Sequence, residues 1–142
     1  MAIVIRTNKS TPQISKKIVY SDFYNNFDKQ DIKNDIKVLE NEESIKTSIK
    51  NLLFTDRGER FFNPTFGSDI KKMLFENFTA STEQVTKDLI KTAIKNFEPR
   101  VDVIDLKVLG NPDKNSMSLT LLFSVINKSE IVTLELILNR VR

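Results

Sequence analysis

The spacing of the apolar residues changes at Pro99, and this change constrains the fold more than any other feature of the chain. Before Pro99, apolar residues recur every three or four positions, as on the buried face of a helix. From Val101 onward they alternate with polar residues in three stretches separated by turn-forming segments, as in antiparallel strands. The spacing predicts an α+β protein, with about three helices packed on one face of a three- to four-stranded, mostly antiparallel sheet.

Three segments before Pro99 carry the helical spacing. The first is expected to span about residues 41–55. The second is expected to be short and to begin at Asp69 or at the serine before it. The third is expected to begin at Ser81, because a glutamine three positions later completes a capping box. It is expected to end before Pro99, since a residue that precedes proline is pushed out of helical geometry.

The first 40 residues differ from the rest in being polar and free of glycine. They bury too little apolar surface to fold alone, so residues 1–40 are expected to form an extended arm with one or two short strands. Residues 41–142 are then a single domain. The spaced aromatic residues of the arm favour an arm that orders against a neighbour over a free tail.

Composition excludes several classes of function. The chain of 142 residues has no cysteine and no histidine, which removes thiolate zinc sites and the usual general base near neutral pH. We therefore expect no metal, no cofactor and no enzymatic activity. The net charge is only +3 and the lysines are interspersed with acidic residues, so no nucleic-acid partner is expected. No apolar run approaches the roughly 20 residues of a membrane span, so no membrane partner is expected either.

Two of the three glycines lie in residues 57–70, which read RGERFFNPTFGSDI. Gly58 and Gly67 are expected to be structural turns. The carboxylates Glu59 and Asp69 suggest an alternative, a lysozyme-like glycoside hydrolase, which needs two carboxyl groups between about 5 and roughly 9.5 Å apart. Asp69 already has an ordinary place at a helix N-terminus, so a packed connector is favoured. The segment then contributes three core residues: Phe61, Phe62 and Phe66.

Glu98, Pro99 and Arg100 form a stiff corner between the third helix and the first long strand. Rigid presentation lowers the entropy lost on binding, and an arginine can hold a carboxylate or a row of carbonyl groups. A local surface pair of Glu98 with Arg100, worth little, explains the same residues equally well. In either case, removal of Arg100 is expected to leave the domain folded.

Four short motifs follow one another in the chain. They read LLFTDRGER at 52–60, PTFG at 64–67, LFE at 74–76 and FEPRV at 97–101. In order and spacing they resemble the gene-25-like baseplate wedge family of contractile phage tails, which has counterparts in type VI secretion and related contractile injection systems. The resemblance covers about 45–108 and continues more loosely through the C-terminal strands.

The resemblance implies a structural role in the virion tail baseplate, assembled in the host cytoplasm, with several copies around the tail axis. It implies that Glu98, Pro99 and Arg100 bind the helical core bundle of other baseplate wedge proteins. It also implies that the sheet offers the tail sheath protein a template for its first ring. We expect either the arm or residues 131–138 to pair with the sheath, because an open sheet edge accepts a strand through its backbone. A soluble adaptor unrelated to tails is the remaining alternative, and these residues fit a phage and a bacterial injection system equally.

Overall fold

The computed structural model describes residues 18–24, 37–111, 115–126, 128 and 130–140. The parts of the expected arm in 1–17 and 25–36 lie outside the described residues. Within the described part of the chain, no helix is both long and apolar enough to cross a membrane. The elements follow in this order: β1 (Ser21–Phe23), β2 (Val38–Glu40), α1 (Glu42–Phe54), α2 (Ile70–Met73), α3 (Ala80–Phe97), β3 (Val101–Asn111), β4 (Ser116–Val125) and β5 (Ile131–Asn139).

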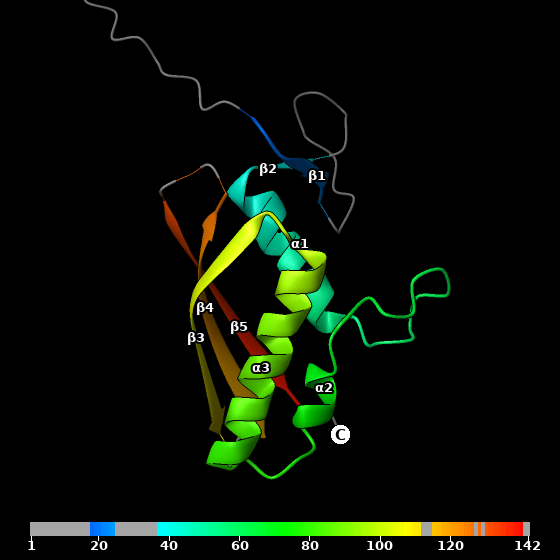
Figure 1. Ribbon diagram of the computed structural model, residues 1–142, viewed down its shortest axis with the longest axis vertical. Coiled ribbons are helices and arrows are strands. Elements are labelled where there is room, and N and C mark those ends of the chain that lie inside the picture. Colours follow the sequence, from blue (N-terminus) through cyan, green and yellow to red (C-terminus); the bar gives the residue numbers. More distant parts are fainter. Residues whose placement is uncertain (1–17, 25–36, 112–114, 127, 129, 141–142) are drawn as a thin grey trace, which may run out of the picture.

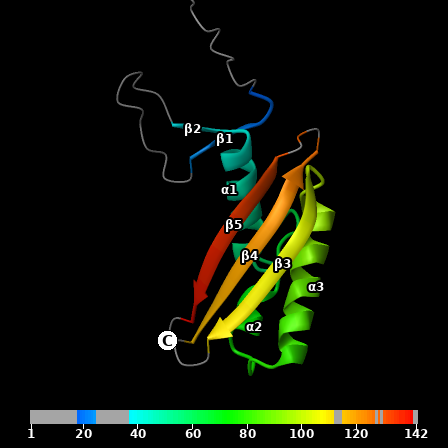
Figure 2. The same cartoon turned by 90° about the vertical axis from the view of Figure 1, so that its left-hand side faces the viewer.

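The three long strands form one antiparallel sheet in the order β3-β4-β5, and β1 and β2 form a separate antiparallel pair. The helices lie together on one face of the larger sheet (Figure 1). Figure 2, turned by 90°, shows the three strands in front, with α1 and α2 behind them and α3 beside β3. These features confirm the predicted α+β class, with helices on one face of an antiparallel sheet.

The core lies between the apolar faces of the helices and the apolar face of the larger sheet. In α1, Ile45, Ile49 and Leu52 recur at helical spacing and are at most 2% exposed. In β5, buried residues alternate strictly with exposed ones. The apolar face of the helices therefore packs against the inner face of the sheet, as the change of apolar spacing at Pro99 predicted.

The start of α3 differs from the prediction. Thr79, not Ser81, occupies the N-cap position, and its side-chain oxygen accepts a hydrogen bond from the amide of Thr82 at 3.2 Å. Ser81 lies exposed in the first turn. The predicted cap was wrong by two residues, because this stretch offers several hydroxyl side chains and the local pattern does not choose between them.

The segment after α1 also departs from the prediction, because Phe61 and Phe62 are not in the core. They are 97% and 105% exposed and belong to the connection between α1 and α2, which extends away from the body as a loop (Figure 1). The loop is closed by a hydrogen bond from the amide of Gly58 to the carbonyl of Pro64, at 2.9 Å, which leaves the residues between them outside. Only Phe66 returns to the core, where its ring packs edge-to-face against the last residue of α3.

Candidate docking corner

The chain turns sharply where α3 gives way to β3. The amide of Glu98 donates the last helical hydrogen bond to Ile94 at 2.8 Å, and Glu98 itself has a non-helical φ of −129°. Its carbonyl accepts from the amide of Val101 at 3.2 Å. The carbonyl of Arg100 accepts from the amide of Ile126, just after β4, at 3.0 Å. The corner is therefore fixed by its backbone to both the helix and the sheet.

The carboxylate of Glu98 points into the fold rather than toward solvent. Glu98 is only 3% exposed. The Arg100 guanidinium grips it as a fork, with Nε donating to Oε1 and Nη2 donating to Oε2 at 2.8 Å. The Ser48 hydroxyl, from α1, donates to Oε2 at 2.6 Å. Glu98, Arg100 and Ser48 thus form a network of three side chains that joins the corner to α1, unlike an isolated surface pair.

These contacts keep Glu98 ionised. Burial alone raises the pKa of a carboxyl group, but the hydrogen bonds from Arg100 and Ser48, with the charge of Arg100, outweigh burial and lower the pKa of Glu98 below 4.5. The hydrogen bond to Glu98 likewise raises the pKa of Arg100 above its ordinary value. The two charges cancel, and two of the five guanidinium N–H groups are used, which leaves three as donors.

The middle of the arm, at Tyr20, lies against this corner. The ring of Tyr20 faces the Arg100 guanidinium, with Cζ 5.2 Å from the ring centre. Asn41 holds Tyr20 in place, because its amide donates to the carbonyl of Tyr20 at 2.7 Å and its Oδ1 accepts from the amide of Val19 at 2.9 Å. Asn41 adopts a φ of +50°, which is uncommon for a residue other than glycine. The arm and the corner therefore form one surface.

Beside the corner, a hollow of about 450 Å³ opens between α3 and the start of β3. Pro99 is exposed at its edge, and two exposed lysines of α3, Lys91 and Lys95, line it. Its full lining is Lys91, Ile94, Lys95, Pro99, Val101, Asp102 and Val103. The corner thus presents a rigid proline beside two lysines, and the partly exposed guanidinium of Arg100 lies in the same turn of the chain.

The three predicted residues lie together but have different surroundings: Glu98 is buried, Pro99 is exposed and Arg100 is a third exposed. Sequence reasoning missed Ser48, although a signal for it existed. Ser48 is polar yet lies three residues after Ile45 and next to Ile49, on the core-facing side of α1. A polar side chain in that position calls for a buried partner.

The predicted turn glycines occupy the two ends of the exposed loop. Gly58 has φ +87° and Gly67 has φ +117°, which are conformations that other residues rarely adopt. A Cβ on Gly67 would also lie 2.5 Å from the carbonyl oxygen of Thr55. At Gly58 nothing lies within 4 Å of such an atom. Gly67 is therefore required by both conformation and space, and Gly58 by conformation alone.

The two carboxylates of the hydrolase alternative have separate local partners. Glu59 is exposed and accepts a hydrogen bond from the amide of Asp56 at 2.9 Å. Asp69 stands at the N-cap of α2 without a side-chain cap bond and pairs with Lys72 at 2.9 Å. Each group has an ordinary structural role at a turn or helix end.

Comparison with known proteins places this geometry in a family. The sequence pattern of the family described as baseplate wedge protein gp25 matches residues 29–129, which include α1, α3, the corner and the first two long strands. The chain belongs to this family. It is 36% identical over 87 residues to the baseplate wedge protein gp25 of Enterobacteria phage T4. The match covers 61% of this chain and 66% of the T4 protein, just under two thirds of that relative's length.

Solved structures show the same fold at lower identity. A protein of Geobacter sulfurreducens, described as a candidate tail lysozyme, superposes with a TM-score of 0.64 at 24% identity, covering 71% of this chain and 92% of that one. A chain in the baseplate of the anti-feeding prophage superposes with a TM-score of 0.59 at 16% identity, covering 83% of each chain. The fold therefore recurs in a chain of the anti-feeding prophage baseplate.

Proposed function

We propose that this chain is a structural, non-catalytic subunit of the baseplate of a contractile tail. Several copies surround the tail axis, each docked on the helical core bundle of neighbouring wedge proteins. The assembled baseplate, made in the host cytoplasm, then offers the sheath protein a sheet edge for its first ring. Family membership supports the baseplate role, and the structure of the corner supports the docking role.

One observation carries the docking proposal: Glu98 is buried and holds Arg100, so the corner is rigid before any partner arrives. A preorganised surface loses little entropy on binding. Because Glu98 already neutralises Arg100, the three remaining N–H groups suit uncharged acceptors, such as the carbonyl groups at the end of a helix. Lys91 and Lys95 suit carboxylates beside them. In this proposal Glu98 is a positioning residue, while Pro99 and Arg100 touch the partner.

The test must separate docking from folding, because removal of Arg100 alone leaves a buried charge. Replacing both partners, Glu98→Met with Arg100→Met, removes both charges while keeping similar volume, a change that is often neutral for folding. We expect the double variant to melt close to wild type and to bind the purified wedge core subunits at least about tenfold more weakly, the loss expected for a buried contact worth more than about 1.4 kcal/mol. Affinity would be measured by titration with immobilised core subunits. Unchanged affinity in the folded double variant would exclude docking through this corner.

Two further variants define which part of the surface binds. Lys91→Glu with Lys95→Glu reverses both cations beside Pro99 without touching the buried pair, and is expected to slow association and to alter its salt dependence. Arg140→Ala is the matched control, because Arg140 also stacks on an aromatic ring but lies near the C-terminus, away from the corner. Equal loss of affinity in all three variants would point to general charge effects rather than a specific site.

The hydrolase alternative has one observation in its favour, the fold shared with the Geobacter protein. We propose that this chain releases no fragments from peptidoglycan, because Glu59 and Asp69 are each engaged in local structure. Purified protein would be incubated with peptidoglycan and the soluble products separated by chromatography. Turnover that disappears in Glu59→Gln would overturn the non-catalytic assignment.

A further inference from the structure

The larger sheet has an outer face that the helices do not cover. Along β5, buried residues alternate with exposed ones, so every second side chain points away from the core. Figure 2 shows this outer face toward the reader, and among the described residues no helix or strand lies over it. The uncovered face of an antiparallel sheet is ordinarily polar, because its side chains contact water.

One row of residues on the outer face is apolar at both ends. Leu109 of β3 pairs with Ser118 of β4, and Ser118 pairs with Ile137 of β5, so the three residues lie side by side across the sheet. Leu109 is 66% exposed and Ile137 is 69% exposed. Two large apolar side chains therefore flank a small hydroxyl side chain in open solvent.

The next row on this face carries opposite charges at its ends. Lys107 of β3 pairs with Thr120 of β4, and Thr120 pairs with Glu135 of β5. Two strand spacings, together about 10 Å, separate the backbones of the charged residues. In the described part of the chain, neither Lys107 nor Glu135 forms an ion pair. A cation and an anion are therefore both available to another molecule.

Each of these rows is complementary to its own reverse. Two sheets that stack face to face about a two-fold axis parallel to β4 keep their positions along the strands but exchange edges, so β3 of one copy lies over β5 of the other. Lys107 of each copy then faces Glu135 of the other, and Leu109 faces Ile137. Leu122, half-buried on the same face of β4, lies near the axis opposite its own counterpart.

We propose that the free chain forms a two-fold pair with a second copy of itself through this outer face, with the axis parallel to β4. The apolar side chains exclude water from the contact, and the two pairs of Lys107 with Glu135 select its orientation. An axis perpendicular to the strands places β3 over β3 and brings Lys107 toward the second Lys107. The charges thus disfavour that alternative.

The pair is expected to be weak. Three strands offer a small contact, in the class of transient complexes that bury less than about 1,200 Å². In the proposed baseplate, neighbouring copies are related by rotation about the tail axis rather than by a two-fold axis between them. The pair therefore belongs to the free chain, and a weak pair can separate on assembly.

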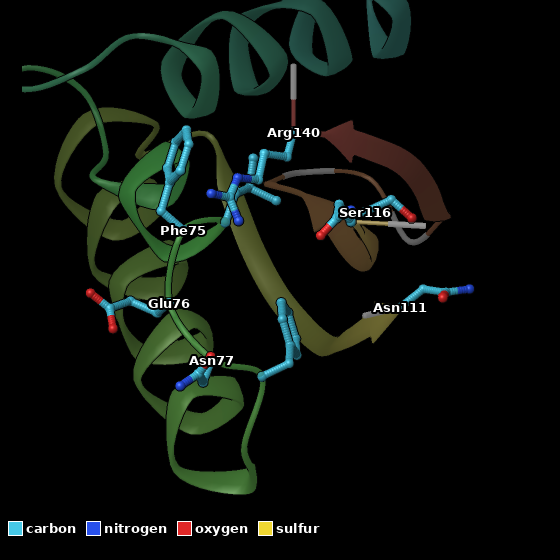
Figure 3. A pocket seen from close by; sticks show the side chains of 9 residues that line it. Phe75, Glu76, Asn77, Asn111, Ser116 and Arg140 are labelled. Carbon is cyan, nitrogen blue, oxygen red and sulfur yellow. The ribbon is translucent and has the colours of Figure 1, made fainter. Parts of the chain in front are cut away.

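The apolar part of the outer face is bounded at one end by polar residues. Asn111 of β3 pairs with Ser116 of β4 in the row beyond Leu109. These two residues also border a hollow of about 140 Å³, in which Figure 3 shows the side chains of Arg140 and Phe75 next to each other. The contact between copies is therefore expected to centre on the rows of Leu109 and Lys107.

Charge reversal tests the orientation of the pair. Sedimentation velocity of the full chain across a concentration series is expected to show a monomer–dimer equilibrium. Lys107→Glu and Glu135→Lys each place like charges opposite each other twice, so each should raise the dissociation constant at least about tenfold. Both substitutions in one chain restore opposite charges and should restore dimerisation. A wild-type chain that stays monomeric would overturn the inference and leave this face to a different protein.

Mixing the two single variants provides a sharper test. A Lys107→Glu chain is acidic at both ends of the row and a Glu135→Lys chain is basic at both ends, so a mixed pair has two favourable contacts. We expect the mixture to form heterodimers at concentrations at which each variant alone is monomeric. Lys50→Glu, which makes the same change of charge on the exposed side of α1, is the control and should dimerise like wild type. Absence of heterodimers, or equal loss with Lys50→Glu, would overturn the proposed orientation.

The apolar contact is tested by Ile137→Ser, which is expected to weaken the pair about tenfold. The exposed aromatic residues of the loop between α1 and α2 are the other apolar surface through which copies could associate. Phe61→Ser combined with Phe62→Ser is therefore the comparison and should leave the dissociation constant unchanged. Circular dichroism melting curves check that each variant is folded. Dimerisation that survives Ile137→Ser but is lost in the loop variant would assign the contact to the loop and overturn the inference.

Discussion

Both ends of the domain place an arginine over an aromatic ring. Near the start of β3, the Arg100 guanidinium lies 5.2 Å from the centre of the Tyr20 ring. Near the end of β5, the Arg140 guanidinium lies 4.8 Å from that of Phe75. The difference is in the counter-ion: Arg100 grips the buried carboxylate of Glu98, whereas no described carboxylate pairs with Arg140.

This difference separates an arginine that builds the fold from one that is available to a partner. A stacked guanidinium on a half-exposed ring contributes little by itself, about 0.5–1 kcal/mol. A buried carboxylate, in contrast, depends on its cation, because an unpaired charge in the interior is strongly unfavourable. The same type of contact therefore accompanies a large contribution to stability at Arg100 and a small one at Arg140. The difference arises because Glu98 is buried.

The largest effect is expected from Arg100→Ala. The substitution removes the cation from a residue that is 3% exposed in the wild-type fold and leaves Ser48 as its remaining side-chain donor, so the free energy of unfolding should fall by about 3 kcal/mol. The expectation drawn from sequence, that the domain stays folded without Arg100, did not include this loss of stability. Urea denaturation of the purified protein measures it. A decrease in the free energy of unfolding below about 1 kcal/mol would mean that solvent reaches Glu98. Arg100 would then contribute no more to stability than Arg140 does.

A smaller effect is expected from Asn41→Ala, which breaks the link between the arm and the corner. The variant loses the acceptor for the amide of Val19 and keeps an unfavourable φ of +50°, together worth about 1–2 kcal/mol. Asn41→Gly relieves the conformational part and loses only the acceptor, so it should be less destabilised. Hydrogen exchange at Val19 should accelerate in both variants while the amide of Glu98 stays protected. Unchanged exchange at Val19 would show that the arm is held by other contacts.

The corner should also respond to acid. Because the pKa of Glu98 is lowered in the folded protein, its stabilising contribution is complete above pH 4.5 and is lost as the pH falls below that value toward the folded pKa. The other carboxylates titrate in the same range, so the informative quantity is the difference between wild type and Glu98→Gln. Below pH 4.5 this difference in the free energy of unfolding should shrink, and urea titrations at several pH values measure it. A difference independent of pH would indicate that the pKa of Glu98 is the same in the folded and unfolded states.

Sequence reasoning succeeded where the signal is local. The period of the apolar residues predicted the helices, the strands and their packing, because burial of one face is repeated at every turn or every second residue. Pro99 marked the end of α3 for the same reason, since its effect on Glu98 acts on the adjacent residue. Motif order then identified the family without any knowledge of contacts.

It failed where the structure depends on partners distant in sequence. The hydroxyl that binds Glu98 comes from Ser48, 50 residues earlier, and no local pattern connects the two. Phe61 and Phe62 were assigned to the core because they are apolar, but the hydrogen bond between Gly58 and Pro64 closes the loop and leaves them outside. An apolar side chain favours burial, but the path of the backbone determines whether it can reach the core.

The smallest effect is expected from Arg140→Ala, the counterpart of the first prediction at the other end. Only the stacking on Phe75 is lost and no buried charge is exposed, so the free energy of unfolding should fall by at most about 1 kcal/mol. The same urea titration measures it, with Arg100→Ala alongside. Affinity for the wedge core subunits should be unchanged, the reverse of the result expected at the corner. A destabilisation as large as that of Arg100→Ala would mean that Arg140 is also part of the fold, because only loss of a buried partner produces an effect of that size.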